Sequence, residues 1–405
     1  MAFELRARTQ KGERLVALAE TLADEIAPLA GAHDQDATFP YDSFETIKES
    51  GYFAAAIPVE LGGLGVTSTH DVVVASSRLA RGDASLTLGV NMHLAYVLNV
   101  VRRWQVARAS ADWRRADAFG GSLERIAREE LVFAAAGSEP AQDLTRPSTI
   151  AARTDAGWIV TGCKVFCTMS PAADVLYTTV TFVNDEGGEC YGYALVPREA
   201  PGVVVHDDWD ALGMRSSASH TISFEAVELP ESALRGGFRV GDAVSFMERN
   251  LTAGLFHAAA ALGVAEAADG AARVPLGRRA KLDPRSVMLT AENVVDLSAA
   301  RAVFSRAAEL IDEQHDRHPE SQPPDDELTG LFAETQSAKA FVGEAAMRSV
   351  DRSLALSGGA GYLNGSPLAR AYRDVRATPF MHPLGANRAY VFLGELAAGR
   401  EPTLH

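Results

Sequence analysis

Val175-Leu-Tyr-Thr-Thr-Val-Thr-Phe182 departs from the pattern of the sequence on either side of it, and it decides the fold class. Its β-branched and aromatic residues favour a strand, because such side chains pack well on a pleated surface. Turn residues follow at once in Asn184-Asp-Glu-Gly-Gly188. Evenly spaced short strands of this kind predict a small antiparallel barrel or sandwich. Similar runs occupy Trp158–Gly162, Tyr191–Val196, Gly202–His206 and His220–Val227.

The segments on both sides of these strands are patterned for helices. Between residues 13 and 130, apolar residues recur at spacings of three and four, which gives a helix one apolar face. The same period returns after Gly241 and marks four helices, with a charged, proline-rich joint at residues 317–326. The marking residues are Leu15, Leu18, Leu22 and Ile26; then Phe246, Leu251, Leu255 and Leu262; Leu297, Val303, Leu310 and Ile311; Phe332, Phe341, Ala345 and Val350; and Ala389, Phe392 and Leu396.

The order of helices, strands and helices indicates separate structural units rather than alternating βαβ units. We therefore predict an α+β fold in three domains. An N-terminal all-α domain takes residues 1–130, a small antiparallel β-barrel takes residues 131–238, and a C-terminal four-helix bundle takes residues 239–405. Gly-x-Gly-x-x-Gly never follows a predicted strand, so a Rossmann-type flavin site is not expected.

Composition restricts the partners of the chain. The formal net charge of −15 argues against nucleic acid and anionic membranes, since both favour basic surfaces. The three cysteines lack a zinc-type spacing and indicate reduced thiols in a cytoplasmic protein, so no metal is expected. The most apolar stretch, Leu255–Ala268, is interrupted by His257 and Glu266, so no membrane span is expected.

Several short motifs, in order along the chain, carry a family resemblance. Each is weak alone, but together they cover nearly the whole sequence, which resembles the acyl-CoA dehydrogenases. The resemblance implies one buried flavin, FAD or alternatively FMN, and a homo-oligomer (a dimer or tetramer), because the family's flavin spans subunits. The motifs are Gly51-Tyr-Phe-Ala-Ala-Ala-Ile-Pro-Val-Glu-Leu-Gly-Gly-Leu-Gly65, Ser138-Glu-Pro140, Gly162-Cys-Lys-Val-Phe-Cys-Thr168, Ala173-Asp174, Leu212-Gly-Met-Arg-Ser-Ser217, Val227-Glu-Leu-Pro230, Gly358-Gly-Ala-Gly-Tyr362 and Arg373-Asp374.

The resemblance assigns flavin contacts to particular residues. In the family an aromatic side chain packs against the isoalloxazine and a threonine hydrogen-bonds near N5, and these correspond here to Phe166 and Thr168. Ser138 keeps the hydroxyl of the threonine in the family's Thr-Glu-Pro motif. The alternative for Phe166 and Thr168 is a strand end with a buried phenylalanine and a hydrogen-bonded threonine.

The resemblance also indicates phosphate contacts. Gly358, Gly359 and Gly361 can bring backbone amides close to a phosphate because no bulky side chain intervenes, although a helix C-cap and turn would use the same glycines. Arg273 resembles the family arginine that contacts the ADP half of FAD across a subunit interface. Three further family positions have changed, which weakens ADP binding and leaves FMN, or loosely held FAD, as alternatives. They are Leu276, Pro284 and Ala355.

The catalytic base of the family is a glutamate, because dehydrogenation needs a carboxylate to remove the α-proton. In many members it follows Arg-Asp by eight residues, and that count reaches His382 here. Other members place it in a Glu-Arg pair early in the bundle, which resembles Glu248-Arg249. Glu248 on an apolar face beside the flavin would have a raised pKa, with Arg249 as its partner. The alternative is a solvated Glu248 in the first turns of a helix.

Three functions remain open at this point. The first is flavin-dependent α,β-dehydrogenation of an acyl thioester on CoA or a carrier protein, with Glu248 as base and an electron-accepting flavoprotein as partner. The second is a two-component flavin monooxygenase, which takes reduced flavin from a reductase, binds oxygen at C4a and hydroxylates a small molecule. There, His382 would act as acid or base, and Ser217 and Ser219 would meet the flavin peroxide. The third is a scaffold that only binds acyl chains.

Overall fold

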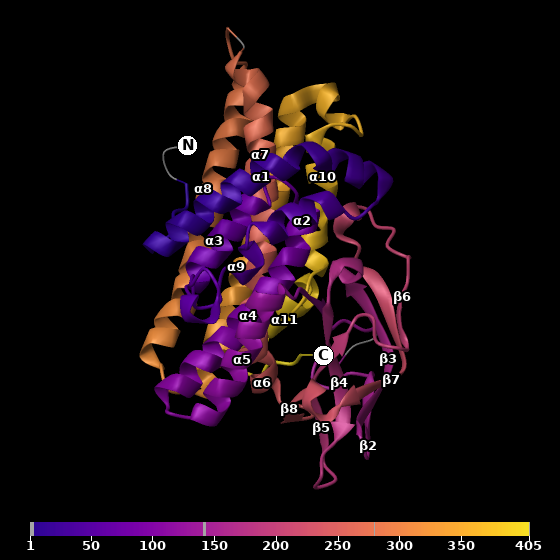
Figure 1. The fold of residues 1–405 in the computed structure, drawn as a ribbon. Helices are drawn as coiled ribbons and strands as arrows, with labels where there is room; N and C mark the ends of the chain where they lie inside the picture. Colours follow the sequence, from indigo (N-terminus) through magenta and orange to yellow (C-terminus); the bar gives the residue numbers. More distant parts are fainter. Residues whose placement is uncertain (1–3, 141–142, 279, 405) are drawn as a thin grey trace.

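The computed structural model describes residues 4–140, 143–278 and 280–404, and it confirms the α+β fold class. Figure 1 shows the N-terminal and C-terminal helices packed side by side, with the strands gathered beside their lower end. The helices are α1 (Gln10–Asp36), α2 (Tyr41–Glu49), α3 (Thr69–Leu79), α4 (Ala84–Ala109), α5 (Trp113–Glu129), α6 (Ala243–Arg249), α7 (Ala253–Gly277), α8 (Pro284–Arg317), α9 (Asp325–Ser357), α10 (Pro367–Asp374) and α11 (Ala386–Ala397). The strands are β1 (Phe133–Ala136), β2 (Ile150–Thr154), β3 (Gly157–Cys167), β4 (Val175–Val183), β5 (Glu189–Pro197), β6 (Val203–Val205), β7 (His220–Pro230) and β8 (Leu234–Arg239).

The N-terminal helices form where their apolar periodicity and caps direct. Thr9 caps α1 by accepting a 3.0 Å hydrogen bond from the amide of Gly12, and Leu15, Leu22 and Ile26 are buried along one face. Helix α4 is long and apolar enough to cross a membrane, which the expectation based on Leu255–Ala268 overlooked. However, 83% of its apolar window is buried inside the protein, as in the core helix of a domain.

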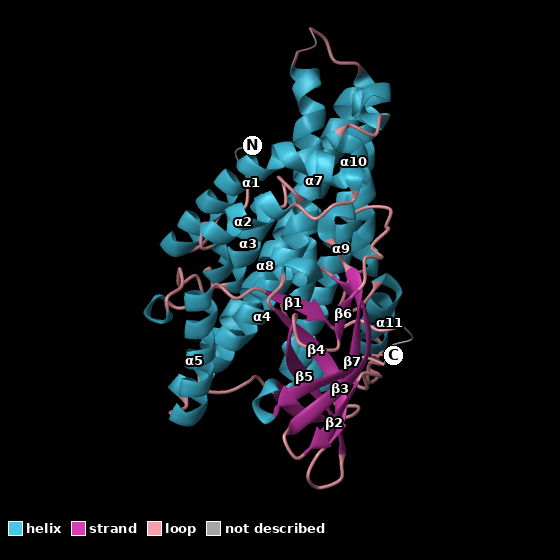
Figure 2. Ribbon diagram, turned by 45° about the vertical axis from the view of Figure 1, so that its right-hand side comes forward, coloured by secondary structure: helices cyan, strands magenta, loops and turns pink. Residues whose placement is uncertain are grey.

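The strands form one sheet with its own apolar core (Figure 2). The sheet order is β6-β7-β3-β2-β4-β5-β8, and β1 pairs with β4. Pairing is antiparallel except where β1 and β2 each run parallel to β4. The five runs expected from the sequence are β3 to β7, whereas β1, β2 and β8 were not expected. Phe133-Ala-Ala-Ala136 and Leu234-Arg-Gly-Gly-Phe-Arg239 carry few β-branched residues, so tertiary pairing rather than propensity makes them strands.

The C-terminal region differs from the expected four continuous helices in two places. The first expected helix is broken into α6 and α7, which meet at an angle of 42°. The short last helix, marked by Ala389, Phe392 and Leu396, is α11, but it is preceded by an unexpected α10 and a short 3-10 segment at Val375–Phe380. Phe341, expected in the core, is 36% exposed on α9. The break between α6 and α7 matters most, because it lies at the functional site.

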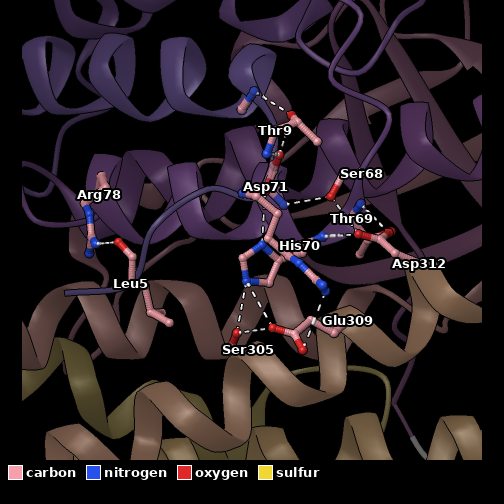
Figure 3. Close-up of polar contacts among 12 residues, drawn as sticks. Leu5, Thr9, Ser68, Thr69, His70, Asp71, Arg78, Ser305, Glu309 and Asp312 are labelled. Atoms are coloured by element: carbon pink, nitrogen blue, oxygen red, sulfur yellow. Dashed lines mark hydrogen bonds and ion pairs between the residues drawn. The ribbon is translucent and has the colours of Figure 1, made fainter. Parts of the chain in front are cut away.

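A buried polar cluster ties the start of the chain to the helical core (Figure 3). The carboxylate of Asp71 accepts hydrogen bonds from the amides of Arg8 and Thr9, at 2.7 and 3.0 Å, and from the Thr9 hydroxyl at 2.6 Å. His70 bridges Asp71 and the Ser305 hydroxyl of α8, at 3.1 and 3.0 Å. One carboxylate therefore fixes the segment that leads into α1.

Replacing Asp71 with asparagine is expected to lower the free energy of unfolding by about 1–3 kcal/mol at neutral pH, because an amide cannot accept all of these bonds. Burial alone would raise the pKa of Asp71, but the hydrogen bonds from His70, Arg8 and Thr9 lower it below 3.8. A depressed pKa stabilises the fold above the unfolded-state value, and that stabilisation is lost as pH falls through the folded value. Urea unfolding of the unaltered protein and of Asp71→Asn should therefore show a difference in the free energy of unfolding that becomes smaller in acid.

The matched control for this prediction is Asp24→Asn on the exposed face of α1. It should leave the urea midpoint nearly unchanged. Equal losses in the two variants would contradict the role given to Asp71.

Candidate functional site

A cavity of about 570 Å³ lies where the strands meet both sets of helices. Its walls come from α4, the ends of β1 and β3, strands β4 and β5, the loop at residues 209–214, the α6–α7 junction and residues 373–382. Most lining side chains are apolar or aromatic, and no aspartate or glutamate is among the described residues that line it. The polar lining residues are Ser138, Thr168, Tyr177, Thr179, Tyr193, Ser219, Asn250, His257, Arg373, Arg376 and His382.

The sheet side of the cavity collects residues that the sequence predicts to hold a flavin. Ser138, Phe166 and Thr168 all line it, although they come from separate loops and strand ends. The Thr168 hydroxyl lies 2.9 Å from that of Ser219, which in turn lies 2.7 Å from the buried hydroxyl of Ser217. The chain thus brings an aromatic ring and a row of hydroxyls to one wall.

Phe166 is presented to the cavity by an unfavourable backbone conformation. Its φ is +58°, which is uncommon for a residue with a bulky side chain, and its side chain is 64% exposed against the edge of Trp209. Positive φ values also occur at Met169, just after β3, and at Met214 and Ala218, just before β7. Such strain persists where the surrounding structure imposes it and is frequent at functional sites. A flat apolar ring with polar edges fits this wall, because Phe166 offers a face and the hydroxyls offer hydrogen bonds.

A buried ion pair holds this wall in place. The Glu139 carboxylate lies 2.5 Å from the Nζ atom of Lys164 and accepts hydrogen bonds from the amides of Ser148 and Thr149 at 2.6 and 2.9 Å. Lys164 also donates to the Thr179 hydroxyl at 2.9 Å. Burial opposes the charge on Glu139, but Lys164 and the hydrogen bonds lower the pKa of Glu139 to about 2. The motifs that contain Glu139 and Lys164 are therefore joined by a buried ion pair that stabilises this wall. Sequence analysis did not assign this role to either residue.

The Leu212–Ser217 motif and the Arg373-Asp374 motif, which lie far apart in the sequence, meet at the next part of the cavity wall. A Cβ atom on Gly213 would lie 2.2 Å from the carbonyl oxygen of Arg373, so only glycine fits there. The amide of Met214 donates to the Asp374 carboxylate at 2.6 Å, and burial raises the pKa of Asp374 to about 7. This contact places residues 373–382 against the sheet side.

The bundle side of the cavity is made by one face across the α6–α7 junction. Phe246, Asn250, Ala253 and His257 recur at spacings of three and four and all line the cavity. The side-chain nitrogen Nδ2 of Asn250 donates to the Phe246 carbonyl at 2.9 Å. The side-chain oxygen Oδ1 of Asn250 is therefore the acceptor for Nε2 of His382, at 2.9 Å. His382 therefore carries its proton on Nε2 and keeps Nδ1 as an acceptor.

The ionisable groups of this wall are held without charge or with little charge. Desolvation, with a further contribution from Lys339, lowers the pKa of His382 to about 3. Desolvation, with further contributions from Lys339 and His382, holds the pKa of His257 well below its ordinary value of 6.5. Burial also lowers the pKa of Lys339 to about 7, and its Nζ atom donates to the carbonyls of His382 and Leu384 at 3.2 and 2.8 Å. Both imidazoles are therefore neutral at physiological pH.

Glu248 does not lie where the sequence led us to expect it. Phe246 and Asn250 face the cavity, and Glu248, midway between them on α6, points to the other side. There its two carboxylate oxygens lie 2.7 and 2.5 Å from Nη2 of Arg103 on α4. Arg249 is not its partner either, since that guanidinium lies 4.1 Å from the Phe238 ring centre. The expected placement of Glu248 at the cavity is wrong, because the helix face points the other way.

The predicted phosphate contacts also lie away from the cavity. Arg273 is sixteen residues beyond His257, about 24 Å along a helix, and its guanidinium lies 2.7 Å from Asp269. The glycine segment follows the end of α9, where Gly358 has a φ of +63° and acts as the helix C-cap. Because the resemblance places the Arg273 contact across a subunit interface and the family's flavin spans subunits, these contacts stay predictions about an assembled oligomer. The glycines concerned are Gly358, Gly359 and Gly361.

On the bundle side of the cavity, sequence analysis missed two polar residues, Asn250 and His257. Asn250 lies in the quoted Met247-Glu-Arg-Asn250 segment, but the break between α6 and α7 that turns it inward has no proline or glycine to announce it. His257 was noted only as an interruption of an apolar stretch. The available signal was a polar residue within a buried apolar helix face, because a buried polar residue often indicates a functional site.

The fold and cavity define a flavin-binding enzyme, and comparisons with known proteins agree. Residues 13–113, 133–227 and 236–387 match the N-terminal, middle and C-terminal domains of acyl-CoA dehydrogenases. The chain belongs to the acyl-CoA dehydrogenase family, whose members are flavin-dependent enzymes.

Three relatives are similar to this chain over nearly its whole length. L-evernosamine nitrososynthase from Micromonospora sp. is 31% identical, over 98% of this chain and 93% of its own length. Amino sugar nitrososynthase RubN8 from Streptomyces rubradiris is also 31% identical, over 97% and 91%. The crystal structure of KijD3 in complex with FMN and dTDP-3-amino-2,3,6-trideoxy-4-keto-3-methyl-D-glucose has a TM-score of 0.89 at 29% identity, over 98% of this chain and 96% of that one.

Proposed function

We propose that this chain is the oxygenase component of a two-component flavin monooxygenase, and that it oxidises the nitrogen of a primary amine on a nucleotide-linked amino sugar. The observation that carries the proposal is a large apolar cavity whose bundle wall holds two neutral imidazoles and no carboxylate among its described lining residues. The names of the relatives, which act on amino sugars, support the choice of substrate.

The amine must react through its lone pair, so it must be bound without a charge. A carboxylate beside the amine would favour the ammonium form, whereas a neutral imidazole and a desolvated wall favour the free amine. Nδ1 of His382 can accept a hydrogen bond from the amine, because Asn250 fixes the proton on Nε2. The apolar walls exclude water from the reacting nitrogen.

The proposed reaction balances as follows. The amine nitrogen gains one oxygen atom from O2 and becomes a hydroxylamine, and the other oxygen atom leaves as water. Reduced flavin, when bound, supplies the two electrons and two protons that this requires. Ser138, Phe166, Thr168 and Ser219 would hold the flavin ring, and a separate reductase would deliver it in the reduced state.

Dehydrogenation of an acyl thioester is the second candidate, motivated by the family to which the chain belongs. It requires a carboxylate within reach of the substrate's α-proton. Glu248 points away from the cavity and pairs with Arg103, so the geometry favours oxygenation.

We further propose that the chain assembles as a dimer or tetramer. Val287, Met288 and Val295 on α8, and Tyr390 and Val391 on α11, are exposed apolar side chains that a second copy would cover. The same assembly would bring Arg273 and the Gly358 segment to a neighbouring subunit's cofactor.

The proposed function predicts a specific requirement for reduced flavin and oxygen. The protein is mixed with FMN, a flavin reductase, NADH and dTDP-3-amino-2,3,6-trideoxy-4-keto-3-methyl-D-glucose under isotopically labelled oxygen. Mass spectrometry should show one labelled oxygen atom on the sugar nitrogen, and omission of the reductase should abolish it. Bleaching of bound flavin by an acyl-CoA without oxygen, together with no labelled product, would instead establish dehydrogenation.

A further inference from the structure

His257 is a buried histidine that faces the cavity without a partner. It lies in the second turn of α7, on the face that includes Phe246, Asn250 and Ala253, and only 4% of its surface is exposed. Neither ring nitrogen has a hydrogen-bond partner among the described residues. A buried polar group left in this state destabilises the fold, so a purely structural role does not explain it.

His93 shows what a structural histidine looks like in the same protein. It is fully buried on α4, where Nε2 lies 3.0 Å from the carbonyl oxygen of Phe53 and Nδ1 accepts from the amide of Phe133 at 3.1 Å. Both of its nitrogens are therefore satisfied within the protein. His257 is similarly buried and lines the cavity, but neither of its nitrogens has a hydrogen-bond partner among the described residues.

Burial, with further contributions from its neighbours, keeps His257 in the neutral form. Lys339 and His382 approach it from α9 and from the loop before α11, and both disfavour a positive charge on the ring. A neutral imidazole has one acceptor nitrogen. With Nδ1 of His382, the bundle wall thus offers two acceptors, which is the number of N–H bonds in a primary amine.

We propose that His257 is a substrate-positioning residue that accepts one N–H bond of the amine while His382 accepts the other, so that the lone pair points away from the bundle wall. This assignment rests on the proposed amine oxidation and names the residues that orient its substrate. The amine lone pair is then directed toward the sheet side, where Phe166 and Thr168 lie.

The test compares His257→Leu, His257→Gln and His93→Leu in the full-length protein, with dTDP-3-amino-2,3,6-trideoxy-4-keto-3-methyl-D-glucose as substrate. His257→Leu should raise KM roughly tenfold to hundredfold, because one hydrogen bond is lost, and change kcat less. Binding of dTDP alone should be unchanged, since it has no amine. His257→Gln should recover part of the affinity, because its amide oxygen is an acceptor.

Thermal unfolding separates this role from a structural one. His257→Leu should unfold at the same temperature as the unaltered protein or higher, because an unpaired polar group is removed from the interior. His93→Leu should unfold earlier, with no change in KM for the molecules that remain folded. If the unaltered protein oxidises the amine and His257→Leu has the same KM, the His257 assignment is overturned alone. If the unaltered protein does not oxidise it, both proposals are overturned.

Discussion

Replacing Glu139 with glutamine should destabilise the folded chain by about 3–5 kcal/mol, the range for breaking a buried ion pair by removing one partner. Lys164 is completely buried and would lose the charge that offsets its own. The carboxylate also holds the amides of Ser148 and Thr149, so an amide in its place leaves some of these donors without an acceptor. Chemical denaturation should show this loss directly, and flavin affinity should fall because Ser138 adjoins Glu139.

Acid should remove the same contribution from the unaltered protein. The pKa of Glu139 is about 2 in the folded state against an ordinary 4.5, so its stabilisation is complete above 4.5 and disappears as pH falls toward 2. The unfolding midpoints of the unaltered protein and Glu139→Gln should therefore converge over that interval.

Two further variants make the Glu139 prediction specific. Glu139→Gln combined with Lys164→Met removes both charges and should recover much of the lost stability. Glu189→Gln breaks an exposed ion pair with Arg146 and should cost less than about 1 kcal/mol. A double variant as unstable as the single one would show that the buried charge is not the cause.

Replacing His382 with leucine should lower the rate of amine oxidation about 100-fold, the lower end of the effect of a positioned proton-accepting group. The substitution removes the acceptor at Nδ1 and leaves the oxygen atom of Asn250 without its donor. Oxygen consumption should continue, because the substitution leaves unchanged the residues proposed to hold the flavin ring, namely Ser138, Phe166, Thr168 and Ser219. The measurement is the amount of oxidised amine formed for each oxygen molecule consumed.

The control for His382 is His318→Leu. His318 pairs with Glu327 at 3.0 Å and does not line the cavity, so its loss should not change this ratio. A normal ratio in His382→Leu would remove His382 from the reaction.

Local patterns in the sequence were sufficient for the order of helices and strands, and family motifs marked residues that the structure brings to one wall of the cavity. Strands β3 to β7 follow runs of β-branched residues, and Ser138, Phe166 and Thr168 were identified by motifs that lie on or beside them. Short-range patterns work for the strands because a strand with one buried face fixes which residues point to each side.

The bundle wall could not be predicted in the same way. The break after Arg249 has no proline or glycine signal, and it decides that Asn250 rather than Glu248 meets the cavity. The pairing of Glu248 with Arg103 joins residues 145 positions apart, which no local spacing reveals. The neutrality of His257 and His382 likewise depends first on burial by the surrounding segments and then on Lys339, which lies on another helix.

The sequence by itself determined the α+β class and the order of helices and strands, because these depend on side-chain periodicity along each segment, and family motifs marked Ser138, Phe166 and Thr168, which share one wall of the cavity. Only the tertiary structure decided which polar groups face the cavity and whether they carry charge. Those properties arise where α4, α6, α7, α9 and residues 373–382 pack together, since helix direction and desolvation are set by neighbours that are distant in sequence.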